Sequence, residues 1–227
     1  MTIIYKTKYA IICYPKKRGD LMKSINPIDL SPKDNYKLLS GSVIPRPIAF
    51  VTSLNEKGVL NAAPFSFFNM VAGTPPLIVL SVGRIKGEIK KHTAQNILEK
   101  GEFVVHILDM DLLETMNQTS APYSDSVSEV ERVGLSPIDS TEIDVPGVKE
   151  AKVRLECKLF QHIPLEENQE CNNDLFIGKV IKYHIDDAIY DNGRILAEQL
   201  NPIARLAGPN YAQLSENIFL ERPSKGE

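Results

Sequence analysis

The sequence predicts a mainly β protein, an antiparallel barrel with a few short helices. Two observations favour this class. About six segments have the length and apolar content of strands, and they do not alternate with long helices as a parallel sheet requires. The chain has 227 residues, of which 43% are hydrophobic, so a single domain can bury a sizeable core.

Composition excludes several other classes of protein. Lysine and arginine number 26 against 29 aspartates and glutamates, a net charge of −3, so no basic excess indicates nucleic acid or an anionic membrane as a partner. No apolar run reaches the roughly 18 residues of a transmembrane helix. The three cysteines and four histidines lack the spacing of zinc ligands and suggest no disulfide framework. We therefore expect a cytoplasmic protein without a metal site.

We expect residues 1–21 to be a dispensable extension before a domain that covers residues 22–227. Lys6 and Lys8 interrupt the apolar residues of this segment, and the basic group from Lys16 to Arg18 follows them. A signal peptide has its basic residues first, and chain ends are commonly poorly ordered. An additional strand is the alternative interpretation.

The first half of the chain is expected to hold strands and two short helices. The strands are expected at residues 45–54, 59–63, 77–82 and 102–108. Gly58 supplies the turn of a hairpin between the first two of these strands. The first helix should run from Thr93, its expected N-cap, to Gly101. The second helix is expected near residues 109–119.

The second half begins with residues 119–150, which are rich in serine, acidic residues and proline and are expected to form a solvated loop with at most a short helix. Residues 151–159 alternate between apolar and polar, so we expect a half-buried strand with Cys157 in its core-facing row. A polar loop over residues 166–174 should lead into a long strand over 175–185. Gly178 in that strand indicates a bulge or a close approach of another segment.

An aromatic cluster follows the predicted hairpin. Phe65, Phe67 and Phe68 can pack against a flat ring, while Ser66 and Asn69 offer hydrogen-bonding groups at its polar edge. The alternative is that these residues only form part of the core.

A basic cluster precedes the first predicted helix. Lys90, Lys91 and Thr93 converge on the helix N-terminus, where charge and oriented amide groups both favour an anion. Arg46 lies between two prolines on a stiff backbone, and we expect it to join this cluster around one phosphate group. A ring site and a phosphate site together indicate a mononucleotide-like cofactor, for which FMN is the obvious candidate. A solvated basic loop is the alternative.

At these residues the sequence resembles the flavin reductase-like, FMN-binding split-barrel family, and within it the flavoredoxin-type branch. The resemblance extends from about residue 22 to about residue 220. Six segments carry it in the same order along the chain. They are residues 36–49, 63–69, 75–77, 91–97 with 101–105, 177–185 and 202–211.

The resemblance implies a Greek-key split barrel that forms a homodimer, with FMN near the subunit interface. It also implies an enzyme that reduces flavin with NADH or NADPH and passes the electrons to oxygen, a partner monooxygenase or another acceptor. Arg46, Lys91 and Thr93 would contact the phosphate, with Lys90 as a neighbour. The ring and ribityl chain would be lined by Ile48, Ala49, Pro64, Phe65, Ser66, Phe67, Phe68, Asn69 and Ser81.

His184 and Tyr211 are weaker candidates for the face that nicotinamide or substrate approaches, and no general acid or base is assigned because the flavin carries the chemistry. His92 stands where relatives commonly have an acidic residue. We therefore hypothesise that phosphate affinity depends mildly on pH; coincident FMN titrations of the wild type and His92→Gln between about pH 5.5 and 8 would refute this. The alternatives to a reductase are an FMN-binding electron carrier without a nicotinamide site and a purely structural barrel.

Overall fold

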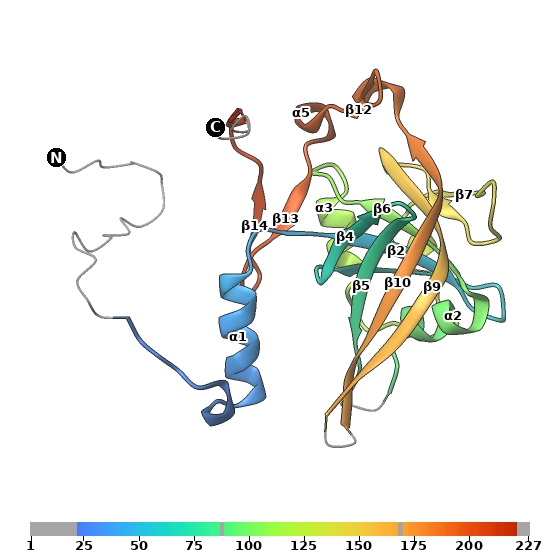
Figure 1. Cartoon of the computed structure of the whole chain (residues 1–227). Coiled ribbons are helices and arrows are strands. Elements are labelled where there is room, and N and C mark those ends of the chain that lie inside the picture. Colours follow the sequence, from blue (N-terminus) through green and yellow to red (C-terminus); the bar gives the residue numbers. More distant parts are fainter. Residues whose placement is uncertain (1–21, 87–88, 168–169, 222–227) are drawn as a thin grey trace. The chain divides into compact units, whose positions relative to one another are not determined.

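The computed structural model describes residues 22–86, 89–167 and 170–221 (Figure 1). The chain divides into a unit of residues 1–39 and a unit of residues 40–227. The described part of the first unit contains the 3-10 helix η1 (Pro27–Asp29) and most of α1 (Pro32–Ser42). Asn26 caps η1 by accepting from the Ile28 amide, and the Asn35 side chain donates to the Pro27 carbonyl at 2.9 Å. The predicted extension over residues 1–21 lies outside the described residues.

The second unit is built around a seven-stranded antiparallel sheet, which confirms the mainly β class. The strand order is β3-β2-β6-β9-β10-β5-β4. β3 and β4 stand at the two ends of this order, yet they are nearly continuous in the chain, and the Ser81 amide of β5 donates to the Phe67 carbonyl between them. The strands are β2 (Ala49–Leu54), β3 (Leu60–Phe65), β4 (Phe68–Gly73), β5 (Pro76–Gly83), β6 (Glu102–Ile107), β9 (Val153–Glu167) and β10 (Glu170–Ile185).

The predicted strand over residues 45–54 is wrong in one respect, because the chain changes sheets at Ile48. β1 (Arg46–Pro47) pairs with β13 (Ile203–Arg205), which pairs with β14 (Tyr211–Gln213), whereas β2 pairs with β3 and β6. Prolines 45 and 47 have no backbone N–H to give to a central strand, so this part of the chain is unsuited to the large sheet.

The remaining elements are short. Two small pairs, β7 (Pro137–Ile138) with β8 (Gly147–Val148) and β11 (Tyr190–Asp191) with β12 (Arg194–Ile195), complete the strands. The helices are α2 (His92–Lys100), α3 (Leu113–Gln118), α4 (Glu129–Arg132), the 3-10 helix η2 (Asp187–Ile189) and α5 (Ala197–Leu200). Within the described ranges, no helix combines the length and apolarity needed to cross a bilayer.

Two hydrophobic clusters occupy opposite faces of the sheet. Val51 and Val105 are opposite each other on β2 and β6 and belong to the first cluster, while Phe50 and Val104 point to the other face and belong to the second. The second cluster also contains buried residues from residues 119–150, namely Val130, Leu135, Ile143, Val145 and Val148. The expectation of a solvated loop there is therefore wrong, because this segment covers the second face.

The expected polar loop over residues 166–174 is also wrong. β9 and β10 continue as paired strands of 15 and 16 residues and stand side by side in Figure 1. Asp174 of this region is fully buried. Its carboxylate accepts two hydrogen bonds of 2.8 Å from Arg84 and a third of 2.8 Å from His162, and these partners stabilise the buried charge. Aspartate is mostly exposed in proteins, so the sequence alone predicts an exposed side chain here. The partners that allow its burial are distant in the sequence and are brought together only by folding.

Other sequence predictions are confirmed. Gly58 has φ +78° at the β2–β3 turn, and Gly101 has φ +71° after α2. Gly178 lies at a register shift of β10, and an added Cβ there would stand 2.5 Å from Cζ of Phe103. Cys157 is fully buried in the first cluster, and burial raises the pKa of its thiol, which removes it as a nucleophile.

Candidate functional site

A pocket of about 490 Å³ opens between the start of α2 and the strand β3; we call it the α2 pocket. Its lining includes the apolar residues Ala63, Pro64, Phe65 and Ile85 together with Lys91 and Thr93 at the start of α2. The pocket is completed by Asn61, His92, Thr119, Ser120, Ala121, Pro122, Tyr123 and Glu129. An apolar wall with a few convergent polar groups is the common form of a small-molecule site.

The N-terminus of α2 is open to an anion. Lys91 is the N-cap residue, and its side chain makes no capping hydrogen bond within the described part of the chain. The first-turn amide groups and the positive end of the helix dipole favour a negative group at this position. Among the described residues, the Lys91 ammonium has no ion-pair partner, and its side chain is exposed.

Thr93 is not the helix cap that the sequence predicts, because α2 begins one residue earlier, at His92. Its hydroxyl is buried and accepts a hydrogen bond of 2.9 Å from the Asn61 side chain. Ser53 in turn accepts from Asn61 at 3.3 Å and from Asn96 at 3.1 Å. This buried network joins the β2–β3 hairpin to α2 and so fixes the position of the helix N-terminus. The sequence alone does not predict this network, although polar residues within predicted strands could have indicated it.

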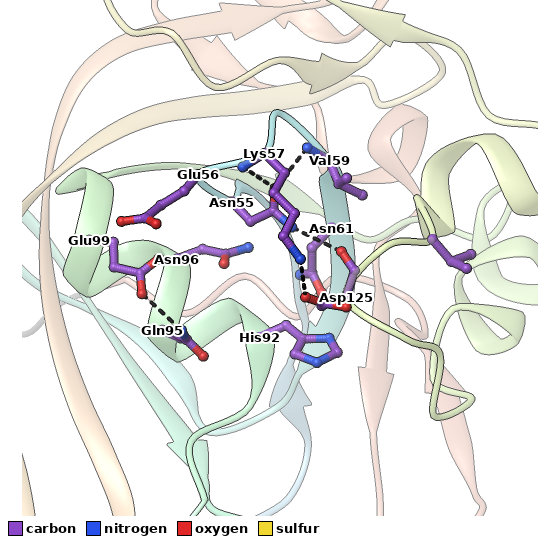
Figure 2. A pocket seen from close by; sticks show the side chains of 11 residues that line it. Asn55, Glu56, Lys57, Val59, Asn61, His92, Gln95, Asn96, Glu99 and Asp125 are labelled. Atoms are coloured by element: carbon purple, nitrogen blue, oxygen red, sulfur yellow. Dashed lines mark hydrogen bonds and ion pairs between the residues drawn. The ribbon is translucent and has the colours of Figure 1, made fainter.

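A second, smaller pocket of about 120 Å³ adjoins the α2 pocket, with which it shares Asn61 and His92. Figure 2 shows the Lys57 ammonium directed at Asp125, 3.0 Å away, with His92 close by. The lining of this smaller pocket is almost entirely polar, and the pocket is too small for a flavin ring. We call it the hairpin pocket, after the β2–β3 turn that forms one side of it.

Glu129 places a carboxyl group in the α2 pocket. Its Oε2 atom accepts from the Ala62 amide at 3.0 Å, and the residue is buried. Burial raises the pKa of this carboxyl above its ordinary value, in spite of that hydrogen bond and the nearby His92.

Arg46 does not line the α2 pocket, and its expected contact with the same phosphate group as Lys91 and Thr93 stays a prediction. The Arg46 guanidinium lies 3.5 Å from the Ser66 hydroxyl, just beyond the end of β3, whereas Thr93 binds Asn61 near its beginning. The change of sheets at Ile48 places the Arg46 guanidinium among backbone carbonyl groups.

The predicted ring-lining residues divide into those that reach the α2 pocket and those that do not. Pro64 and Phe65 line it. Ile48 and Ala49 are buried in the two clusters, and Ser81 accepts a hydrogen bond from Asn173 at 3.1 Å. Ser66, Phe67, Phe68 and Asn69 follow β3 outside this pocket, where the Phe67 ring lies 6.0 Å from the Arg46 guanidinium.

Three further candidates also lie away from the α2 pocket. Lys90 precedes the N-cap and does not line the pocket. Tyr211 of β14 binds Arg205 through its hydroxyl, with the guanidinium 4.6 Å from its ring. His184 of β10 pairs with Glu156 and belongs to another groove.

Residues 40–199 match the family described as "Flavin reductase like domain". The chain belongs to this family, and its fold is the family's split barrel. The match includes β1 to β10, all of α2 and every residue that lines the α2 pocket.

Individual relatives agree with this assignment. The chain is 51% identical over 198 residues to the uncharacterized protein YwrF of Bacillus subtilis, covering 86% of this chain and 96% of that protein. Among solved structures, nitrilotriacetate monooxygenase component B from Bacillus cereus is 52% identical, with a TM-score of 0.87 over 89% of this chain and all of that one.

Two further structures place the resemblance to flavoredoxins in context. The 2-nitrobenzoate 2-nitroreductase NbaA of Pseudomonas fluorescens is 34% identical, with a TM-score of 0.80 over 89% of this chain and 98% of that one. The flavoredoxin of Desulfovibrio vulgaris is 20% identical, with a TM-score of 0.66 over 79% of this chain and 91% of that one, and shares the fold.

Proposed function

We propose that this protein is an FMN-binding oxidoreductase of the flavin reductase type, which takes hydride from NADH or NADPH and passes electrons to an acceptor. The observation that carries the proposal is the α2 pocket, which combines apolar residues with the start of α2 and with Lys91, a cation that has no ion-pair partner in the described part of the chain. The same pocket lies within the segment that matches the flavin reductase family.

The residues of the α2 pocket fit FMN. The first-turn amides of α2 and the Lys91 ammonium suit a phosphate dianion, and the wall formed by Pro64 and Phe65 suits a flat ring. Bound FMN would supply the two-electron chemistry that amino-acid side chains lack.

The chain itself contributes binding and position. The buried Ser53, Asn61, Thr93 and Asn96 network holds the start of α2 against the hairpin, so the phosphate site is preorganised. Pro64 and Phe65 exclude water from one side of the ring. No side chain is assigned as an acid or base, because positioning suffices for transfer between two stacked rings.

We also propose a homodimer with FMN near the interface and a separate protein or small molecule as electron acceptor. β4 is an end strand of the sheet, and its Met70 and Val71 are 69% and 53% exposed, which is typical of a surface that another chain covers. The relative that is 52% identical is a monooxygenase component and the one that is 34% identical is a nitroreductase. Both support an acceptor outside this chain, and a monooxygenase is the first to test.

An anaerobic absorbance experiment tests the function. Purified protein should bind one equivalent of FMN per chain, and NADH or NADPH should bleach the bound flavin. A spectrum that persists after both nicotinamides would instead indicate the electron carrier, and no FMN binding would refute the proposal.

A pair of neighbouring lysines tests the site. Lys91→Gln should weaken FMN binding at least about tenfold, because a charge-assisted hydrogen bond contributes about 1.5–3 kcal/mol. Lys90→Gln removes the same charge one residue earlier, outside the pocket, and should change the affinity by no more than about twofold. Equal losses in both variants would indicate a general effect of charge and would contradict the assignment of Lys91.

A further inference from the structure

A second groove, of about 400 Å³, lies where β9 begins and β10 ends, and it shares no residue with the α2 pocket. We call it the basic groove. Lys149, Lys152 and Arg154 contribute three cations, and Asp186 is the one carboxylate among its lining residues. The other lining residues are Ala151, Tyr183, His184 and Ile185.

The sheet register explains how these groups come together. Arg154 of β9 stands opposite His106 of β6 on one side and His184 of β10 on the other. Residues directly opposite each other in antiparallel strands project from the same face, so the three side chains form a row across the sheet. His106 is fully buried within this row.

Most charged groups around the basic groove already have partners. Lys152 pairs with Asp111 at 2.7 Å and with Asp109 at 3.3 Å. Glu156 accepts from the amides of Thr141 at 2.7 Å and Glu142 at 2.8 Å, and from His184.

The rim carboxylate is also engaged. Asp186 accepts from the Ala188 amide at 2.9 Å and so caps η2.

Arg154 is different. It is partly buried, yet among the described residues its guanidinium has no hydrogen-bond or ion-pair partner. Burial lowers the pKa of this guanidinium, and the charge of Glu156 only partly opposes the effect. A desolvated and unpaired cation is unfavourable by itself, so an anion beside Arg154 would be stabilised by both charge and geometry.

Lys149 is a second cation of this groove. It is exposed and also has no ion-pair partner among the residues that the structure describes. Within the described ranges, two cations without ion-pair partners thus line one groove, and its acidic neighbours each accept other hydrogen bonds. We propose that the basic groove binds a small anionic molecule, through a phosphate or carboxylate group held by Arg154 and Lys149. This site is separate from the FMN site and does not depend on the function proposed above.

Calorimetric titration of the full-length protein with pyrophosphate and with citrate tests the proposal. We expect saturable binding of at least one of them. The tighter ligand identifies the group, pyrophosphate for a phosphate ligand and citrate for a carboxylate ligand. The absence of binding by both anions would overturn the proposal.

Variants locate the binding. Arg154→Gln should weaken it at least about tenfold and Lys149→Gln several-fold, on the scale of one charge-assisted hydrogen bond each. Lys91→Gln alters the α2 pocket and should leave unchanged the part of the binding that Arg154→Gln and Lys149→Gln weaken. Loss of binding in Lys91→Gln, with both groove variants unaffected, would assign the anion to the α2 pocket and refute the basic groove. Because Lys149 is exposed and unpaired, its variant stays informative even where Arg154→Gln unfolds the protein.

Discussion

Arg46 shows how one side chain can hold a junction of the chain together. Its guanidinium donates to the carbonyls of Ser40 and Val43, each at 2.7 Å, and of Leu206 at 3.0 Å, and the residue is only 6% exposed. The planar fork of arginine donors suits several carbonyl groups at once. Arg46 therefore joins the end of α1 to the segment after β13, a structural role.

Arg46→Ala should destabilise the protein by about 2–4 kcal/mol, because it removes three hydrogen bonds to backbone carbonyls and the packing of a buried side chain. Chemical denaturation measures this change. FMN affinity at a temperature where the variant is folded should stay close to that of the wild type. An unchanged stability together with a tenfold loss of FMN affinity would show Arg46 to be a phosphate ligand, as the family resemblance implies.

His106 is a fully buried imidazole with a defined tautomer. The Val148 amide donates to its Nε2 atom at 2.8 Å, so Nδ1 must carry the hydrogen and donate to the Phe50 carbonyl, also at 2.8 Å. A proton on Nε2 would break the first of these bonds. Burial lowers the pKa of His106 to about 4, with a smaller contribution from the charge of Arg154.

This shift predicts a pH dependence of stability. In the unfolded chain His106 takes up a proton near pH 6.5, whereas the folded protein resists protonation until about pH 4. The contribution of His106 is thus complete above pH 6.5 and declines as the pH falls toward 4. The total loss is on the order of 3 kcal/mol.

His106→Gln is the control, because glutamine offers one donor and one acceptor but does not titrate. Denaturation curves at pH 7 and 4.5 should show a smaller loss for this variant than for the wild type. Acidic residues titrate in both proteins, so the difference between the two losses isolates His106. An imidazole that titrates near pH 6.5 in the folded wild type, followed by NMR, would contradict the prediction.

At the scale of elements, β10 accommodates a neighbouring aromatic ring at Gly178. The Phe103 ring of β6 is fully buried in the first cluster, and its Cζ atom would meet an added Cβ at 2.5 Å. Gly178→Ala should therefore destabilise the protein by about 1–3 kcal/mol through overpacking. Combining it with Phe103→Leu should recover part of the loss in a double-mutant cycle. Additive effects would show that the contact is not the cause.

Elements whose pattern is local were predictable from the sequence, as residues 77–82 and 151–159 show, because their own apolar content or alternation identifies them. Residues 166–174 were not, since Asp174 is stabilised by Arg84, which lies 90 residues away in the chain. Burial opposes ionisation of Asp174, but the hydrogen bonds from Arg84 and His162 outweigh it and lower its pKa. A pattern of neighbouring residues cannot predict such a distant partner.

The candidate site divides in the same way. Lys91 and Thr93 were predictable because a basic residue and a hydroxyl precede a helix pattern. Asn61 and Glu129 were missed, since their roles depend on the packing of β3 against α2 and α4. The surroundings of Arg46 were not predictable, because they depend on which sheet receives residues 46–47.

At the scale of the whole molecule, the described hydrophobic core falls between Ile48 and Ala204. Both clusters and every residue that lines the α2 pocket lie in that interval. Stability and FMN binding should therefore depend mainly on residues 40–227.

A chain that begins at Met22 tests this dependence. Without residues 1–21, the protein should keep its FMN affinity within about twofold and its free energy of unfolding within about 0.5 kcal/mol, because surface changes outside a core have effects of that size. Its melting temperature should also rise with added FMN as in the full-length chain, since a ligand that binds only the folded state stabilises it by mass action. A truncated chain that loses FMN affinity while its stability is unchanged would instead show that residues 1–21 contribute to the binding site.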